Sequence, residues 1–246
     1  MGIPFTVEQF YGVFRDYNTA VWPAQWLLVA MALAAVAAAL TPRPWSGPAV
    51  SAIVAAMWAW IALAYHLAFF IRISPAAYAL AALSIAGSAI FFWEGVVRRR
   101  LAFEWALGPS AVAGGALIVF ALILYPIWSI YEGHRYPATP TFGLPCPTTI
   151  FTIGLLAFAT RPTPRSTLVV PLLWCLVGAQ AAFFLGVRPD LGLIAAAAVG
   201  IGLLFSGRRR HGQMPIVIQG CSLVVPSLQS HAPLRRRLPT GLQDPG

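Results

Sequence analysis

The feature that most constrains the fold of this chain is a series of long segments that carry almost no charge. Only 9% of the 246 residues are charged, whereas a soluble domain of this length spends about a quarter of its residues on charge. Several uncharged segments approach the roughly 20 residues that a helix needs to cross a bilayer. Buried helices of a soluble protein are the alternative, but so many such segments in one chain argue against it. We therefore predict an all-α, polytopic transmembrane helical bundle, whose first partner is the lipid bilayer.

We predict seven transmembrane helices, which divide the chain into three parts. Residues 1–23 interleave aromatic and charged side chains, a pattern typical of an amphipathic helix in the membrane interface. Residues 24–206 form the transmembrane domain, and residues 207–246 form a disordered cytoplasmic tail. The fifth helix is the shortest, because its apolar core, Thr148–Thr160, has 13 residues, which also suits a re-entrant segment. Pro126 and Pro171 should each kink a helix or loosen a turn. The predicted helices cover residues 24–41, 49–72, 76–94, 108–131, 144–160, 167–187 and 190–206.

The positions of the arginines predict how the chain is oriented in the membrane. All 16 basic residues are arginines. Up to Arg210, seven crossings collect nine of them on one side of the membrane and four on the other. Because cytoplasmic loops are enriched in basic residues, we predict an N-terminus outside and a C-terminus in the cytoplasm of a bacterial inner membrane. Most arginines flank apolar segments, so we expect no nucleic-acid partner despite the net charge of +9, and no oligomeric state follows from the sequence.

Two stretches of the chain echo each other at a distance of 114 residues. The first begins at Trp60 and contains His66, and the second begins at Trp174 and has Gln180 at the corresponding position. Both run outwards and turn back, which predicts two three-helix units of the same orientation joined by one linker helix. The sugar transporters called SWEETs have this parallel repeat, and the chain resembles them in layout alone. The residues of the first stretch that recur in the second are Trp60, Ala68, Phe69, Phe70, Pro75, Ala81 and Ala82.

Such a repeat would place His66 and Gln180 opposite each other across its axis, with Trp60 and Trp174 beside them. Polar groups at this depth are costly unless they are partnered, so these four residues form a candidate binding site for a small solute. The alternative is that His66 and Gln180 bond to neighbouring carbonyl groups and only fix the packing of the helices. The sequence allows both interpretations.

A second polar group falls on the predicted outer face and consists of Glu132, His134, Arg135, Cys146 and Asp190. Its residue types suit a metal site, but no two have the spacing of HxxxH or CxxC, so we predict no metal and no cofactor. A nucleophile pair of Cys146 and His134 would have no orienting third group, so we assign no catalytic residue. The simpler interpretation is an ordered loop in which Glu132 forms an ion pair with Arg135 or Arg188.

Several motifs of the chain are familiar as a set. They are Pro4–Phe10, Tyr17–Pro23, Tyr65–Phe70, Pro75–Tyr78, Gly133–Pro137 and Phe142–Phe151. The chain resembles, over roughly residues 3–206, an uncharacterised bacterial family of multi-pass membrane proteins, the domain of unknown function family 6064. The most specific motif is Pro145–Phe151. The resemblance implies an integral membrane protein and supplies no activity, substrate or cofactor.

Three kinds of function are compatible with these observations. A carrier or channel for a small solute is favoured by the repeat and by His66 and Gln180. A non-catalytic membrane scaffold or assembly protein needs no site at all, and a membrane enzyme or sensor would use the outer polar group. An ion-coupled pump is disfavoured, because no carboxylate falls in the middle of a predicted helix.

Overall fold

The computed structural model describes residues 5–104, 108–160 and 163–209, and the regular secondary structure of these residues is helical. This confirms the predicted all-α bundle. The predicted tail lies outside the described residues from residue 210 onwards. The helices are α1 (Val7–Ala20), α2 (Ala24–Leu40), α3 (Ser46–Trp60), η1 (Ile61–Leu67), η2 (Phe70–Arg72), α4 (Ala77–Phe91), η3 (Phe92–Val97), α5 (Pro109–Val119), η4 (Phe120–Leu124), α6 (Tyr125–Tyr131), α7 (Pro145–Leu156), α8 (Ser166–Gly178), α9 (Gln180–Phe184), η5 (Arg188–Leu191) and α10 (Gly192–Arg209).

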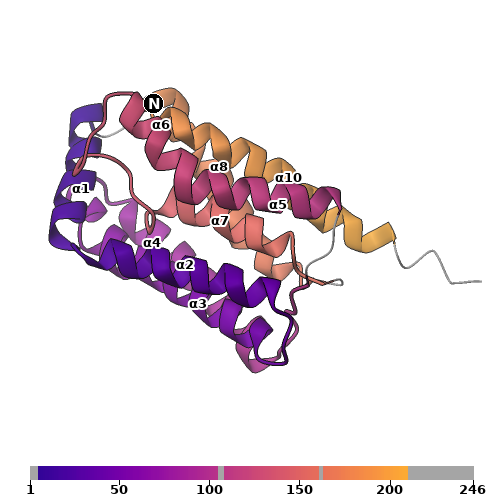
Figure 1. Ribbon diagram of the computed structural model, residues 1–246. Coiled ribbons are helices and arrows are strands. Elements are labelled where there is room, and N and C mark those ends of the chain that lie inside the picture. Colours follow the sequence, from indigo (N-terminus) through magenta and orange to yellow (C-terminus); the bar gives the residue numbers. More distant parts are fainter. Residues whose placement is uncertain (1–4, 105–107, 161–162, 210–246) are drawn as a thin grey trace, which may run out of the picture. The chain divides into compact units, whose positions relative to one another are not determined.

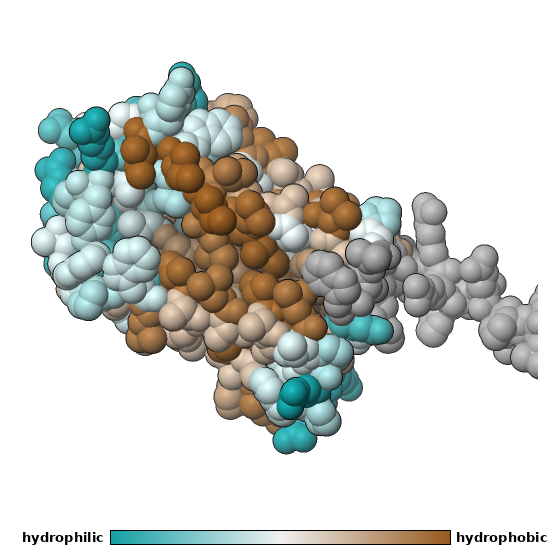
Figure 2. Space-filling model, viewed as in Figure 1, coloured by the Kyte–Doolittle hydropathy of each residue, from teal (hydrophilic) through white to brown (hydrophobic). Residues whose placement is uncertain are grey.

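The apolar helices coincide with the predicted ones to within a few residues. Five helical stretches are long and apolar enough to cross a membrane, and a sixth results if α1 and α2, bent by 87°, form one broken span. α7 is shorter, with 12 residues. The count of seven crossings and the parallel repeat therefore stay predictions. Figure 2 shows a broad apolar surface between two hydrophilic ends of the bundle. The five stretches are Ser46–Arg72, Ala77–Val97, Pro109–Tyr131, Ser166–Phe184 and Arg188–Phe205.

The amphipathic N-terminal segment forms α1, which lies across one end of the bundle (Figure 1). Thr6 and Gln9 start it with a capping box, in which each side chain accepts a hydrogen bond from the backbone N–H of the other. The aromatic face of α1 packs against the protein itself, with Phe14 and Tyr17 beside the ring of Tyr65. The rings that we expected in the headgroup zone are thus buried, because the end of the bundle offers them an apolar surface.

α7 occupies the interior of the bundle. Its residues are buried on all sides, except that Cys146 is half-buried, and it packs against α3, α5, α8 and α10. The indole nitrogen of Trp58 in α3 donates a hydrogen bond to Thr152 Oγ1 at 3.3 Å. Close approach to α5 is possible because Gly114 and Gly154 face each other. The short length of α7 therefore goes with a position that lipid does not reach.

Two helical stretches near one end of the bundle widen into π-helical turns, η1 and η4. η4 directly precedes Pro126, whose ring nitrogen cannot donate to the carbonyl of the preceding turn, so the helix loosens there as predicted. α8 instead continues through Pro171. η1 contains Tyr65 and His66 and has no proline to account for it. Single π turns often occur at functional sites, so η1 makes His66 a candidate functional residue.

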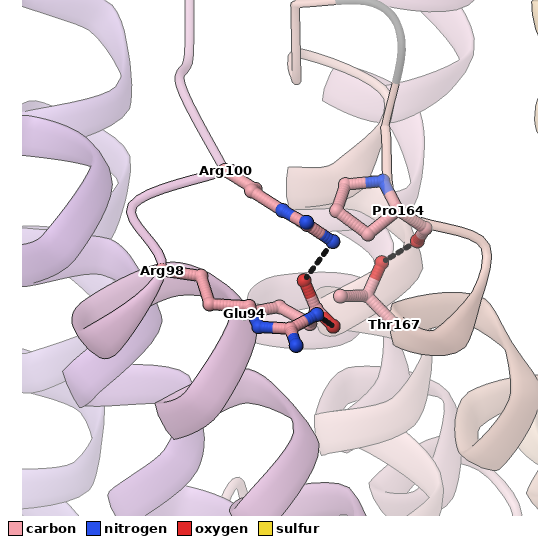
Figure 3. Close-up of polar contacts among 5 residues, drawn as sticks. All are labelled: Glu94, Arg98, Arg100, Pro164 and Thr167. Carbon is pink, nitrogen blue, oxygen red and sulfur yellow. Dashed lines mark hydrogen bonds and ion pairs between the residues drawn. The ribbon is translucent and has the colours of Figure 1, made fainter.

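The end of the bundle opposite α1 holds a carboxylate shared by two arginines (Figure 3). The oxygens of Glu94 lie 3.5 Å from a guanidinium nitrogen of Arg98 and 3.5 Å from one of Arg100. Nearby, the Thr167 hydroxyl donates to the carbonyl of Pro164 at 2.7 Å. These contacts join the end of η3 to the following loop, and they are remote from α1.

The packing of α5 on α7 gives a first prediction. A methyl group on Gly114 would lie 2.6 Å from Ala157 Cβ and 2.7 Å from the carbonyl oxygen of Gly154, whereas one on Gly115 would meet nothing within 4 Å. We expect Gly114→Ala to destabilise the protein by about 1–3 kcal/mol through overpacking. Gly115→Ala should be neutral or stabilising by up to about 1 kcal/mol, because alanine favours helix. Thermal unfolding of both variants in detergent checks this, and equal midpoints would contradict the close approach.

Candidate functional site

A cavity of about 770 Å³ lies beneath α1, at the ends of η1, α7 and α8. Its wall is mainly aromatic and aliphatic, and a few polar side chains interrupt it. Val7 and Phe184 at the rim are 46% and 64% exposed, whereas His66 is 1% exposed. The cavity therefore extends from a mouth between α1 and α9 to a buried inner end. The wall of the cavity includes Phe10, Phe14, Tyr65, His66, Tyr125, Cys146, Trp174, Gln180 and Ala181.

His66 is the polar residue of the wall whose hydrogen-bonding groups are least satisfied. Both of its ring nitrogens are buried, and neither has a hydrogen-bond partner among the described residues. Aromatic rings hold the imidazole in place: Tyr65, Phe70 and Trp174 lie with their centroids 5.2, 6.0 and 5.3 Å from it. A buried donor or acceptor left without a partner costs about 1–3 kcal/mol. A ligand group that reached the imidazole from the cavity would recover this free energy.

Trp174 and Cys146 continue the polar part of the wall. The buried indole nitrogen of Trp174 has no oxygen or nitrogen partner among the described residues, and it adjoins the Cys146 sulfur, a weak acceptor. Gly178 makes room for both groups, because a methyl group there would lie 3.2 Å from Trp174 Nε1 and 3.4 Å from Cys146 Sγ. Trp174 therefore presents a second donor near His66, and the two belong to different helices.

Asp190 lies directly behind this wall. It is 1% exposed, and its carboxylate accepts hydrogen bonds from the Tyr125 hydroxyl and from the Cys146 thiol. No cation forms an ion pair with it among the described residues; its neighbour Arg188 contacts Glu132 instead, at 3.1 Å. Burying an ion costs several kcal/mol, and each hydrogen bond to a charged group returns about 1.5–3 kcal/mol. The two hydrogen bonds therefore offset part of the cost of burying this carboxylate, and no ion pair among the described residues offsets the rest.

α1 covers the cavity and is fixed by the side chain of Asn18. This residue is fully buried, and its Nδ2 donates to the carbonyl oxygens of Pro137 and Thr139 at 2.6 and 2.7 Å. Its Oδ1 accepts from Thr141 Oγ1 at 2.7 Å, and its own carbonyl accepts from Gln25 Nε2 at 2.9 Å. A single side chain thereby joins the end of α1, the start of α2 and the loop between α6 and α7.

The four residues of the predicted solute site have different positions. His66 and Trp174 contact each other in the inner wall. Gln180 also lines the cavity, but it is exposed, and its Nε2 donates to the carbonyl of Leu176 in the preceding helix, α8, at 3.4 Å. Trp60 is not in the wall, because its indole nitrogen donates to the Tyr17 hydroxyl at 2.7 Å. His66, Trp174 and Gln180 thus line one cavity, and among the described residues His66 contacts Trp174 and has no hydrogen bond to Gln180.

The predicted outer polar group divides into separate contacts. Glu132 pairs with Arg188, one of the two partners expected for it, and also accepts from Trp128 Nε1 at 3.1 Å. His134 stacks on Tyr11 with ring centroids 3.8 Å apart, and Arg135 is exposed. Cys146 belongs to the cavity wall instead, and Asp190 lies directly behind that wall. Within the described part of the chain, no three His, Cys, Asp or Glu side chains are grouped so that they could hold a metal ion.

Two features of the site were not predicted from the sequence: α1 covers the cavity, and the Tyr125 hydroxyl donates a hydrogen bond to Asp190. The phenylalanines of α1 were assigned to the membrane interface, since hydropathy alone does not distinguish a ring packed on lipid from one packed on protein. Asp190 was placed on the outer surface, because it follows a loop arginine and precedes an apolar run. A useful signal was present in Pro126, which follows Tyr125 directly; the loosened turn that it predicts, η4, ends just before Tyr125 and marks this helix as irregular near the cavity.

The sequence model described as "Family of unknown function (DUF6064)" matches residues 7–215, so the chain belongs to this family. The resemblance seen in the sequence is confirmed, and the matched region extends slightly past Ser206. No curated protein and no solved structure matches the chain.

Proposed function

We propose that this member of the family of unknown function is a membrane carrier for a small, largely apolar solute that bears a hydrogen-bonding group. Cavities that bind small molecules usually measure about 300–1,000 Å³ and combine an apolar wall with a few placed polar groups. The cavity beneath α1 has this size and this composition. An apolar solute could reach its mouth beside α9, where Phe183 and Phe184 are both more than 60% exposed.

The observation that carries the proposal is the unsatisfied imidazole of His66 at the inner end. In a helix bundle whose only purpose is assembly, such a residue would be expected to bond a neighbouring carbonyl group. Here both nitrogens lack a partner among the described residues, while the ring adjoins a cavity. A solute hydroxyl, carbonyl or amide would supply the partner, and Trp174 would add a donor beside it.

The topology that goes with this function has seven crossings, with α1 on the outer side of a bacterial inner membrane and the end of α10 in the cytoplasm. The distribution of arginines supports this orientation. Further support comes from α1 and the end of α10, which lie at opposite ends of the bundle in Figure 1. In this orientation the cavity opens towards the outer leaflet.

The proposal is tested by comparing His66→Ala with Gln180→Ala, two residues of one cavity that differ in burial. Small neutral alcohols, phenols and amides would be screened by the rise in unfolding temperature that they cause, and those that bind would be assayed for uptake into proteoliposomes. We expect His66→Ala to weaken binding roughly tenfold, the effect of about 1.4 kcal/mol. Gln180→Ala should change it less than about twofold, because the exposed Gln180 side chain already bonds to the carbonyl of Leu176.

If no compound stabilises the wild-type protein, or if His66→Ala binds and transports every compound as the wild type does, the carrier function is wrong. A role as a scaffold would then be the better account of the bundle.

A further inference from the structure

Asp190 is an acidic residue enclosed by the protein, and no cation within the described part of the chain forms an ion pair with it. Its carboxylate is held by the Tyr125 hydroxyl of α6 and the Cys146 thiol of α7. Both donors line the cavity, whereas Asp190 itself lies one layer behind them. The side chain is therefore hidden from the solute but connected to the cavity by two groups that can exchange protons.

The other titratable groups near Asp190 are neutral or paired elsewhere. Tyr11 of α1 and Tyr65 of η1 also interact electrostatically with Asp190, and neither carries a positive charge. On its own element, Arg188 is bound to Glu132. His66 lines the same cavity, but its neighbours are aromatic rings. Nothing in the described residues therefore fixes Asp190 in its charged form, as a salt bridge would.

We propose that Asp190 is a proton-binding site that couples solute binding in the cavity to pH, an inference that rests on the carrier function proposed above. Ionisable residues enclosed in membrane domains commonly serve as proton relays in transporters. An ion-coupled mechanism was disfavoured by the sequence because no carboxylate fell in the middle of a predicted helix. The structure supplies one through the burial of a residue at the start of a helix.

The proton is supplied by a hydronium ion that reaches the cavity from water. As the Tyr125 hydroxyl transfers its proton to the Asp190 carboxylate, its oxygen takes up one proton from this hydronium ion, which is left as a neutral water molecule. One O–H bond forms on the carboxyl group, Tyr125 ends with its O–H restored, and the site gains one positive charge. Release follows the same path in reverse. Cys146 offers a parallel path of the same kind through its S–H group.

The charge of Asp190 changes what the cavity favours. The ionised form places a negative charge behind an apolar wall, where a neutral solute gives it no compensation. The protonated form removes that charge and leaves the two donors freer to turn towards the cavity. Binding of a neutral solute and binding of the proton should therefore reinforce each other, and by linkage the coupling is reciprocal.

Infrared spectroscopy tests the proton site without any solute. Exposed carboxyl groups have pKa values near 4 and are ionised at about pH 6. At this pH we expect the full-length wild-type protein in detergent to show the carbonyl band of a protonated carboxyl group, which disappears as the pH is raised. Asp190→Asn should lack the band. Asp16→Asn, which removes an acid with a 61% exposed side chain, should retain it. A band that persists in Asp190→Asn, or that is missing from the wild type, overturns the proposal.

Solute coupling is tested with para-bromobenzyl alcohol, a small neutral probe whose bromine quenches nearby indoles such as Trp174. We expect its affinity for the wild type to fall at least tenfold from pH 6 to the pH at which the band has vanished. Asp190→Asn should keep the affinity of the acidic form at both pH values. Tyr125→Phe removes a donor to the carboxylate and should shift the transition to higher pH, because the ionised form loses more than the neutral form.

The outcomes separate the two proposals. Equal pH dependence in the wild type and Asp190→Asn would refute the coupling. An alcohol that fails to bind at any pH would count against the carrier function, while the infrared band would still decide whether Asp190 binds a proton.

Discussion

Replacing Asn18 with alanine is expected to destabilise the protein by at least about 3 kcal/mol and to release α1 from the end of the bundle. The substitution removes two donated hydrogen bonds to loop carbonyls and one accepted from Thr141, all at a fully buried position. Groups left unpaired in such a place cost about 1–3 kcal/mol each. Thermal unfolding in detergent measures the loss of stability, and proteolysis within α1 measures its release.

The matched control for Asn18→Ala is Thr19→Ala, at the next position of the same helix. Thr19 is exposed, and its hydroxyl bonds only to the carbonyl of Arg15 in the preceding turn. This variant should unfold within a degree or two of the wild type. If the two variants had the same stability and the same resistance to protease, Asn18 would not be the residue that fixes α1 over the cavity.

Filling the cavity is expected to have the second large effect. Ala181 of α9 lies in the wall, so Ala181→Trp would place an indole in the space that the solute needs. We expect binding of the compounds found in the screen to fall by more than about tenfold, with little change in unfolding temperature, because the added ring enters a cavity instead of a packed core. Isothermal titration of the purified protein measures the affinity.

Leu176→Trp provides the comparison for the cavity variant. Leu176 belongs to the preceding helix, is 69% exposed and does not line the cavity, so a tryptophan there should face outwards and leave binding unchanged. Undiminished affinity in Ala181→Trp would show that the solute binds elsewhere. An equal loss in both variants would point to a general disturbance of this part of the bundle.

The helices themselves could be predicted from the sequence, because each of them is a property of one continuous segment. Residues 24–41 and 108–131, for instance, reappear almost unchanged as α2 and as the stretch from α5 to α6. The weakening near Pro126 could be predicted as well, since proline acts on its own turn. The ion pair of Glu132 followed from charge alone, although the sequence left two arginines as partners.

The site could be predicted only in part, because it depends on contacts between segments. His66 was selected for its depth, but its contact with Trp174 of α8 was not predicted, and the indole of Trp60 instead donates to the hydroxyl of Tyr17. That hydroxyl arrives with α1, whose docking onto the bundle has no signature in hydropathy. Asp190 shows the same limit, because its burial is created by Tyr125 and Cys146, which are 65 and 44 residues away in the chain.

The enclosure of α7 has a consequence for how the protein is made. A segment of 12 helical residues with three threonines is a weak signal for insertion into a membrane on its own. Two of the helices that surround it, α8 and α10, are synthesised after it. During biogenesis the chain must therefore keep α7 in place until these later helices arrive. We therefore expect the packing around α7 to be completed only once α8 and α10 have been added.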